Sequence, residues 1–276
     1  MELVFYKYHG LGNDYLVYDY QKNSQKLSTE DICRICHRNY GLGSDGILEG
    51  PFFDNGKISV RILNPDGSEA EKSGNGVRIF SKYLKDAGYV KEQEYKLCTL
   101  GGIVDVHFNN ETGSNMTVSM GKLAFDRASV GAADTPEEMV DIPLEFDGQV
   151  YKCTCVSIGN PHCVIPLEEI SKEKVCHIGK YSETAPYFPN RINTQIVHII
   201  DKNNIEIEIY ERGAGYTLAS GSSSCAAAGA VYRLGLTEPD INVHMPGGIL
   251  KIEIDNEWNV KMTGDVVYVG KMLMPY

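Results

Sequence analysis

The sequence predicts an α+β protein of two pseudo-symmetric domains, each a mainly antiparallel β-sheet wrapped around a central buried α-helix. The main observation is an internal repeat. Ser73-Gly74 and Ser220-Gly221 lie 147 residues apart (220 − 73 = 147), and Asn13 and Asn160 have the same spacing (160 − 13 = 147). In addition, short strand-like runs dominate both halves, and a stretch with helical spacing of apolar residues follows each Ser-Gly dipeptide.

The expected strands are short and occur in both halves. In the first half they are Val4–Tyr8, Leu16–Tyr18, Ile58–Leu63, Ile103–Phe108 and Met116–Met120. In the second half they are Lys152–Ser157, Cys163–Pro166, Thr194–Ile200, Ile205–Tyr210, Ile249–Ile254 and Trp258–Thr263. Polar and apolar residues alternate in several of these runs, which is typical of antiparallel strands with one face in water. A last run, Val266–Leu273, is expected to return and pair with the first domain.

The central helices are expected directly after the Ser-Gly dipeptides. Residues 77–87 carry apolar side chains at helical spacing, and residues 225–232 are apolar almost all round, which is typical of a buried helix. Backbone N–H groups at the start of each helix would be open to a small anion. Another helix start is indicated at Ser28–Asp31.

The domain boundaries follow from the repeat and from a change of composition. Residues 125–138 are small, polar and turn-forming, so the linker is predicted there. We expect one domain at residues 1–122 together with a C-terminal strand at 265–276, and a second domain at residues 123–264.

Composition excludes several functional classes. The 276 residues include 42% hydrophobic and 23% charged residues, enough to bury a core in each half, and the net charge is −11. This acidity argues against nucleic acid or an anionic membrane as a partner. The N-terminal sequence does not resemble a secretory signal, and no apolar run reaches membrane-spanning length. A cytoplasmic protein with a small polar ligand is expected.

The eight cysteines are expected to be reduced thiols. The run Cys33–His37 has the spacing of a haem-attachment motif, but it follows a helix start and no export signal, so no haem is predicted. Cys153, Cys155, His162 and Cys163 could be drawn as a metal site. The two cysteines at 153 and 155 instead alternate with polar residues like the buried face of a strand, so no metal or other cofactor is expected.

The repeated Ser-Gly step has a possible chemical purpose. Two helix N-termini aimed at one point could bind a carboxylate and stabilise the negative charge that develops when an α-proton leaves. Ser73 and Ser220 would then flank the α-carbon. The alternative interpretation is that each serine only caps its helix, since serine is a preferred N-cap residue.

Several blocks resemble the cofactor-independent diaminopimelate epimerases and related racemases over nearly the whole chain. They are His9–Asp14, Gly41–Gly46, Asn64–Ser68, Gly74–Arg78, Gly159–His162, Arg191–Asn193 and Glu211–Gly215. The resemblance implies inversion of an amino-acid α-carbon without pyridoxal phosphate, with LL-diaminopimelate as the first substrate to consider, in the lysine and peptidoglycan precursor pathway. It also implies a homodimer.

The resemblance implies a role for each matching residue. The family's two catalytic cysteines fall on Ser73 and Ser220, and the groups that manage their protons fall on His162 and Glu211. The remaining positions match substrate-binding residues: Asn13, Asn64, Gly74, Asn75, Asn160, Asn193, Arg212, Gly221 and Ser222, together with Glu211.

Three departures from the family pattern leave alternatives open. Serine replaces both cysteines, Tyr216 replaces a glutamate, and Ser222–Ser224 replaces a Thr-Gly-Ala-like turn. A serine hydroxyl is a far weaker acid than a thiol and would need a neighbouring base. The serines could have been introduced to trap substrate, the chain could act on another amino-acid-like substrate, or it could be an amino-acid-binding protein that lost the chemistry.

Overall fold

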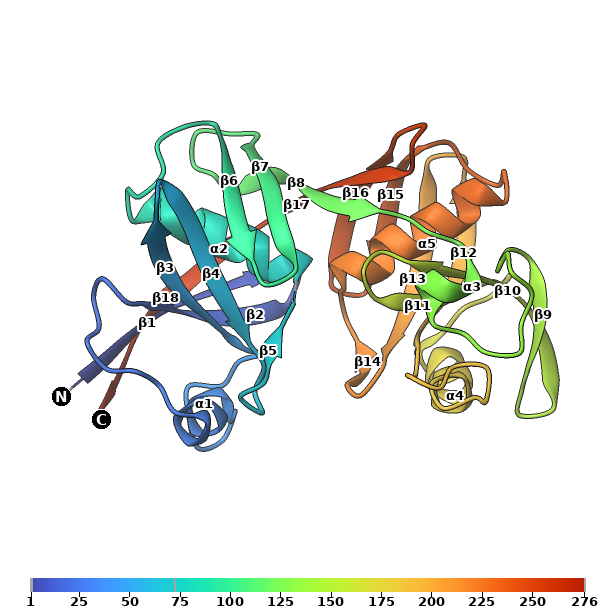
Figure 1. The fold of residues 1–276 in the computed structure, drawn as a ribbon, viewed down its shortest axis with the longest axis horizontal. Coiled ribbons are helices and arrows are strands. Elements are labelled where there is room, and N and C mark those ends of the chain that lie inside the picture. The colour runs from blue at the N-terminus through green and yellow to red at the C-terminus, as the bar shows by residue number, and fades with distance from the viewer. Residues whose placement is uncertain (1, 72, 276) are drawn as a thin grey trace. The chain divides into compact units, whose positions relative to one another are not determined.

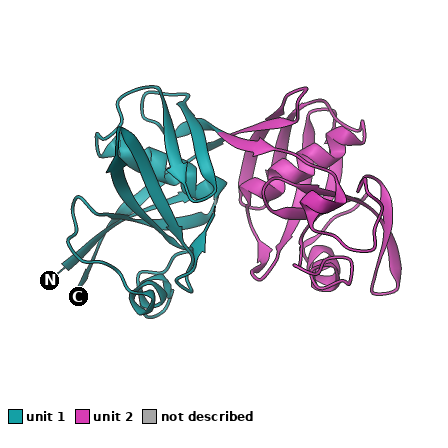
Figure 2. Cartoon of the chain, in the orientation of Figure 1, with its two compact units in different colours: residues 1–118, 263–276 teal, residues 119–262 magenta. Residues whose placement is uncertain are grey.

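The chain folds into two compact units. The computed structural model describes residues 2–71 and 73–275, so residues 1 and 276, at the ends of the predicted first domain, lie outside it. Unit 1 comprises Met1–Val118 with Thr263–Tyr276, and unit 2 comprises Ser119–Met262 (Figure 2). The boundaries expected near residues 122 and 264 stay predictions.

Unit 1 is a sheet with helices α1 and α2. Its elements are β1 (Glu2–Gly10), β2 (Asn13–Asp19), α1 (Thr29–Cys36), β3 (Ile47–Asp54), β4 (Lys57–Leu63), β5 (Glu69–Ala70), α2 (Gly74–Asp86), β6 (Glu94–Thr99), β7 (Gly102–Phe108), the first part of β8 (Asn115–Lys122) and β18 (Val267–Pro275). The order of pairing is β18-β1-β2-β3-β4-β6-β7-β8. The β2–β3 and β4–β6 pairs are parallel, and the others are antiparallel.

Unit 2 has the same plan. Its elements are α3 (Arg127–Val130), β9 (Ile142–Phe146), β10 (Gln149–Ser157), β11 (Pro161–Pro166), α4 (Lys172–Ser182), β12 (Asn193–Asp201), β13 (Asn204–Glu211), β14 (Gly215–Thr217), α5 (Gly221–Arg233), β15 (Asp240–Met245), β16 (Gly248–Ile254) and the first part of β17 (Asn259–Asp265). The order of pairing is β9-β10-β11-β12-β13-β15-β16, and β11–β12 and β13–β15 are the parallel pairs.

The register of the strands confirms the repeat. In unit 1, Leu16 pairs with Ile47, and 147 positions later Cys163 pairs with Thr194 in unit 2. Likewise Ile47 opposes Leu63, and Thr194 opposes Tyr210. Each parallel pair is joined by a crossover that carries a helix, as parallel strands require. The predicted α+β fold of two pseudo-symmetric, mainly antiparallel halves is therefore correct.

A buried helix occupies the centre of each unit. In α2 the side chains of Val77, Ile79 and Phe80 are fully buried, and α5 is buried from Cys225 to Val231. Helix α2 packs on β1, β2 and β3, whereas α5 packs on β10 to β13, β15 and β16 (Figure 1). Burial of this apolar surface is the main stabilising contribution in each unit, and it fixes the N-terminus of each helix against the surrounding strands.

Of three further predictions from the sequence, the start of α1 and the pairing of the C-terminal strand are confirmed, and the linker is not. Ser28 is the N-cap of α1, as predicted, and β18 pairs with β1, as predicted for the C-terminal run. The linker prediction at residues 125–138 is wrong. The chain leaves unit 1 within β8, and residues 125–138 lie in unit 2, where Asp126 caps α3 and Phe125 contacts Trp258.

The cysteines are free thiols. Cys153, Cys155 and Cys163 lie in the buried core of unit 2, which confirms the expected buried face of a strand. Burial raises the pKa of the Cys36 thiol. Within residues 2–71 and 73–275 there is no cluster of three His, Cys, Asp or Glu side chains suited to a metal ion, and no helix long and apolar enough to cross a membrane.

Candidate active site

The first half of the candidate site lies at the N-terminus of α2 in unit 1. Ser73 has an extended backbone and caps the helix, and its Oγ accepts a hydrogen bond from the Gly76 N–H at 3.0 Å. A helix offers no acceptor of its own to its first N–H groups. Those of Gly74 and Asn75 are therefore suited to an anionic group placed at this end of α2.

Asn13 and Asn75 are joined across this helix N-terminus. Asn75 Nδ2 donates to Asn13 Oδ1 at 3.0 Å, and Asn13 Nδ2 donates to Asp45 Oδ2 at 2.8 Å. Arg78, fully buried in the next turn of α2, donates to Asn75 Oδ1 at 2.7 Å. The two amide side chains are therefore held in fixed orientations at the predicted substrate-binding positions.

Charged side chains support the loop that carries Asn13. Arg38 bridges Asp14 and Asp45 with contacts of 2.7 and 2.6 Å, and Lys7 contacts Asp14 at 2.8 Å. Burial disfavours the charged form of Asp14, but the hydrogen bonds from Arg38 and Lys7 outweigh it and lower the pKa of this carboxyl group. His9 also orders the loop, because its Nδ1 accepts the Gly12 N–H at 3.3 Å.

Asn64 stabilises the turn that follows β4 by bonding to Ser68. Its Nδ2 donates to Ser68 Oγ at 2.9 Å, and its backbone N–H donates to Ser68 O. The structure thus gives this predicted substrate-binding residue a local role at the end of β4.

The second half of the candidate site lies at the N-terminus of α5 in unit 2. Ser220 caps this helix and accepts the Ser223 N–H at 3.4 Å. Gly221 and Ser222 follow in the first turn, as Gly74 and Asn75 do in α2. This half also leaves its first N–H groups without an acceptor from the helix.

His162 belongs to a ring of side-chain contacts that is closed through the backbone between Ser222 and Ser223. Asn160 contacts Ser222 Oγ at 3.3 Å and His162 Nε2 at 3.0 Å. On the other side, His162 Nδ1 lies 3.3 Å from Gln195 Oε1, and Gln195 Nε2 donates to Ser223 Oγ at 3.1 Å. The ring ties β11 and β12 to the first turn of α5.

His162 is a neutral imidazole at physiological pH. Complete burial, assisted by the positive charge of Arg212 and opposed by the hydrogen bond with Gln195, lowers its pKa to about 3. Its ring nitrogens lie 3.0 Å from Asn160 Oδ1 and 3.3 Å from Gln195 Oε1, and the single N–H of the neutral ring donates to one of these two amide oxygens. The catalytic role that the family resemblance implies for His162 stays a prediction.

Glu211 is the last residue of β13, and Arg212 begins the loop that follows. Asn193 holds this loop: its Oδ1 accepts the Arg212 N–H at 3.1 Å, and its Nδ2 donates to Pro161 O at 2.8 Å. Glu211 accepts the Thr217 hydroxyl at 3.1 Å. Arg212 is exposed on the surface of unit 2. Asn193 therefore positions the loop with both ends of its amide.

A second support for this loop comes from Glu183 at the end of α4. Its Oε1 accepts the Gly213 N–H at 2.7 Å and lies 3.3 Å from Arg191 Nη1. Nearby, Tyr216 packs its ring against Lys172 Nζ at 4.6 Å. Burial and the Glu208 carboxylate raise the pKa of Tyr216 to about 12. Tyr216 thus acts as a packing residue beside α4.

The predicted residues divide between the units. Unit 1 holds Ser73 with Asn13, Asn64, Gly74 and Asn75, and unit 2 holds the others. Sequence reasoning missed five supporting residues: Tyr15, Asp45, Glu183, Gln195 and Ser223. For Tyr15 a signal existed, since the 147-residue offset relates it to His162.

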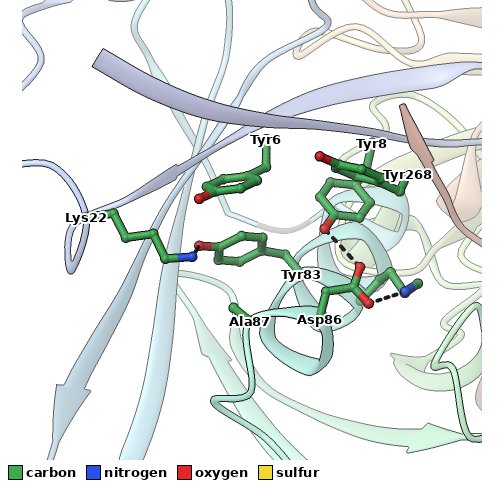
Figure 3. Close-up of a pocket in the computed structure, with 8 residues that line it drawn as sticks. Tyr6, Tyr8, Lys22, Tyr83, Asp86, Ala87 and Tyr268 are labelled. Atoms are coloured by element: carbon green, nitrogen blue, oxygen red, sulfur yellow. Dashed lines mark hydrogen bonds and ion pairs between the residues drawn. The ribbon is translucent and has the colours of Figure 1, made fainter. Parts of the chain in front are cut away.

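One cavity in unit 1 lies at the opposite, C-terminal end of α2. Figure 3 shows Tyr6, Tyr8, Tyr83 and Tyr268 around it, with the Tyr8 hydroxyl directed at Asp86. Burial, with the charge of Asp86, raises the pKa of Tyr8, so this phenol stays protonated. None of the predicted site residues lines this cavity.

Solved structures share the fold of this chain. A hydroxyproline epimerase from Agrobacterium vitis superimposes with a TM-score of 0.74 at 10% identity, over 99% of this chain and 91% of its own. A methylitaconate-delta-isomerase superimposes with a TM-score of 0.60 at 12% identity, over 99% and 95%. This chain therefore shares its fold with these two solved structures.

Sequence comparison identifies the family. The diaminopimelate epimerase family profile matches residues 5–125 and 154–269. Diaminopimelate epimerase 2 of Nostoc sp. is 47% identical over 98% of this chain and 94% of its own length. Diaminopimelate epimerase of Desulfitobacterium hafniense is 37% identical over 98% and 97%. The chain belongs to the diaminopimelate epimerase family and is an isomerase.

Proposed function

We propose that the protein inverts the α-carbon of an amino acid without pyridoxal phosphate, and that LL-diaminopimelate is its first substrate. The observation that carries this proposal is the pair of equivalent helix N-termini, each capped by a serine and bordered by a fixed asparagine, in a chain of this family. The N–H groups of Gly74, Asn75, Gly221 and Ser222 would bind the reacting carboxylate.

The proposed chemistry is a proton exchange at one carbon. The Cα–H bond breaks toward one serine oxygen, the electron pair is delocalised into the carboxylate, and the other serine hydroxyl delivers a proton to the opposite face. The helix N-termini stabilise the added negative charge. The serine that acts as base must first lose its own proton to a neighbour, and the Glu211 carboxylate is the group we assign to accept it.

His162 has a different part in this proposal. Because its pKa is lowered to about 3, it acts as a neutral group that orients Asn160 rather than as an acid. Asn160, Asn64, Asn193 and Arg212 are assigned to the distal end of the substrate. We further propose a cytoplasmic homodimer, as the family resemblance implies, which light scattering of the purified protein would test.

The test is α-proton exchange in D₂O. The purified protein is incubated with LL-diaminopimelate and a panel of L-amino acids, NMR follows loss of the α-proton, and chiral chromatography follows inversion. We expect exchange with inversion of diaminopimelate, at a rate that rises when Ser73→Cys and Ser220→Cys restore thiols, because a thiol is the stronger acid.

Helix capping provides the matched control. Ser73→Ala, Ser220→Ala and Ser28→Ala each remove an N-cap and cost about 1 kcal/mol of stability. Only the first two should abolish exchange. Binding of diaminopimelate without exchange in either the parent or the double cysteine variant would instead identify an amino-acid-binding protein. Exchange of another amino acid alone would reassign the substrate.

A further inference from the structure

Tyr15 lies beside Ser73, the serine of the first half-site. It belongs to β2, is only 7% exposed, and its hydroxyl is 3.3 Å from Ser73 Oγ. Gly46 makes room for the ring, because a Cβ added at Gly46 would lie 2.7 Å from Tyr15 Cε1. The tyrosine is therefore directed at Ser73 by close packing.

Tyr15 occupies in unit 1 the position that His162 occupies in unit 2. The two residues are 147 positions apart, and each follows by two residues an asparagine, Asn13 or Asn160, that contacts the second residue of the central helix. The strand registers agree with this equivalence, because Leu16 pairs with Ile47 as Cys163 pairs with Thr194.

The surroundings of the two aromatic residues differ. In unit 2, His162 bonds with Gln195, which bonds with Ser223. The equivalent positions in unit 1 are Leu48 and Gly76, whose side chains offer no polar atom, and Leu48 lies against Gly76. The aromatic group of unit 1 reaches the serine of its helix, whereas that of unit 2 is held by two amides.

The direction of the bond follows from acidity. Either hydroxyl could donate at this distance, and we assign Tyr15 as the donor and Ser73 Oγ as the acceptor because a phenol is a stronger acid than an alkyl hydroxyl. Ser73 Oγ then accepts both this O–H and the Gly76 N–H, and a negative charge on it is stabilised twice. Ser220 Oγ accepts the Ser223 N–H at the longer distance of 3.4 Å.

We propose that Tyr15 is a positioning residue that donates a hydrogen bond to Ser73 Oγ and makes position 73 more acidic than position 220. The inference rests on the proposed function and deepens it, since it concerns one of the two serines of that same site. Its test measures a titration that needs no turnover, so failure of the epimerase proposal and failure of this one are distinguishable.

The experiment replaces the hydroxyl by a reporter thiol. Ser73→Cys is prepared alone and with Tyr15→Phe, and the rate of alkylation by iodoacetamide at position 73 is followed against pH by peptide mass spectrometry, which separates it from the eight native cysteines. Tyr15→Phe should raise the midpoint of the titration by about one pH unit, a tenfold change in acidity, because one hydrogen bond to the thiolate is lost.

Two controls make the result specific. Tyr18→Phe removes another buried hydroxyl from β2, one that donates to Gln25 O, and should leave the midpoint at position 73 unchanged. Ser220→Cys should show the same midpoint with and without Tyr15→Phe. An unchanged midpoint at position 73 in Tyr15→Phe, or an equal rise at position 220, would overturn the proposal.

A second substitution covers the case in which Tyr15→Phe does not fold. Tyr15→His places in unit 1 the ring that unit 2 carries and keeps a hydrogen-bond donor there. Its midpoint at position 73 should stay close to that of the Tyr15 parent. A midpoint about one pH unit higher would show that a donor at this position does not set the acidity, and would also overturn the proposal.

Discussion

Single residues in the two half-sites show how similar backbones acquire different chemistry. Gln195 and Ser223 replace the apolar Leu48 and the bare Gly76 of unit 1, and both polar side chains are fully buried. Buried polar groups are costly unless paired. The ring of contacts through His162 and Asn160 gives Gln195 and Ser223 polar partners. Removal of any one of these side chains would therefore leave another buried polar group unpaired.

The buried His162 should make stability depend on pH. Its pKa is about 3 in the folded protein and about 6.5 in an unfolded chain, so the unfolded state binds the proton first. The contribution of His162 to stability is complete above pH 6.5 and is lost as the pH falls toward 3, at up to about 1.4 kcal/mol per pH unit.

This dependence can be measured by urea unfolding between pH 7 and pH 4. His162→Gln removes the titrating group and should reduce the slope of unfolding free energy against pH. His37→Gln, which removes an exposed imidazole, is the matched control. Equal slopes for His162→Gln and the parent would contradict the prediction.

Residue roles were only partly predictable from the sequence. The repeat located Ser73, Ser220 and their asparagines, because a fixed offset is visible without a fold. Gln195 carried no such signal, since a single polar residue within an apolar strand has no characteristic spacing. The contact of Gln195 with His162 becomes apparent only from the fold, because the parallel pairing of β11 and β12 places Gln195 beside Val164, two residues after His162.

At the scale of elements, the central helices and the alternating strands were predictable, whereas strands that break the simple pattern were not. β3 was missed because Gly50 and Pro51 interrupt its buried run, and β9 has a proline at its second position. β15 was missed although Ile241, Val243 and Met245 alternate with polar residues. Local pattern alone therefore underestimates the sheet.

Helix α4 offers a prediction at this scale, because it packs a glycine directly on β13. A Cβ at Gly179 would lie 2.3 Å from Tyr210 Cγ and 2.5 Å from Tyr210 Cβ. Alanine is normally favoured over glycine inside a helix by about 1 kcal/mol. Here Gly179→Ala should instead destabilise the protein by about 1–3 kcal/mol, because α4 must move away from the strand.

Thermal or urea unfolding checks this prediction, with the exposed Lys180→Ala in the same helix as control. A Gly179→Ala protein as stable as the parent would contradict it. The displacement should also weaken the support of the Arg212 loop by Glu183, which follows α4 directly.

On the scale of the whole molecule, the repeat and the strand order explain why the fold could be anticipated. The two units repeat one arrangement of sheet and helix with the same strand register. A strand or helix predicted in one half therefore supports the prediction of its equivalent in the other half. The point at which the chain passes from unit 1 to unit 2 could not be located from the repeat. It lies inside β8, where the chain continues as a strand and no change of composition marks it.

Unit 1 depends on a strand from the far end of the chain. Deleting residues 267–275 removes β18, the antiparallel partner of β1 along most of its length. Amide hydrogen exchange should then become fast in β1 while β10 to β13 of unit 2 keep their protection. Leu273→Ser, which changes an exposed side chain and keeps the backbone pairing, is the control. Unchanged protection of β1 after the deletion would contradict this dependence.

Because β18 pairs with β1, the two units cannot be completed in the order in which they are synthesised. Domains generally fold as they emerge from the ribosome, the N-terminal one first. Here all of unit 2 has been translated before the strand that completes unit 1 exists. Unit 1 can therefore be completed only after unit 2 has been translated. Until β18 has been translated, the edge of β1 opposite β2 lacks its partner strand and is open to pairing with another strand.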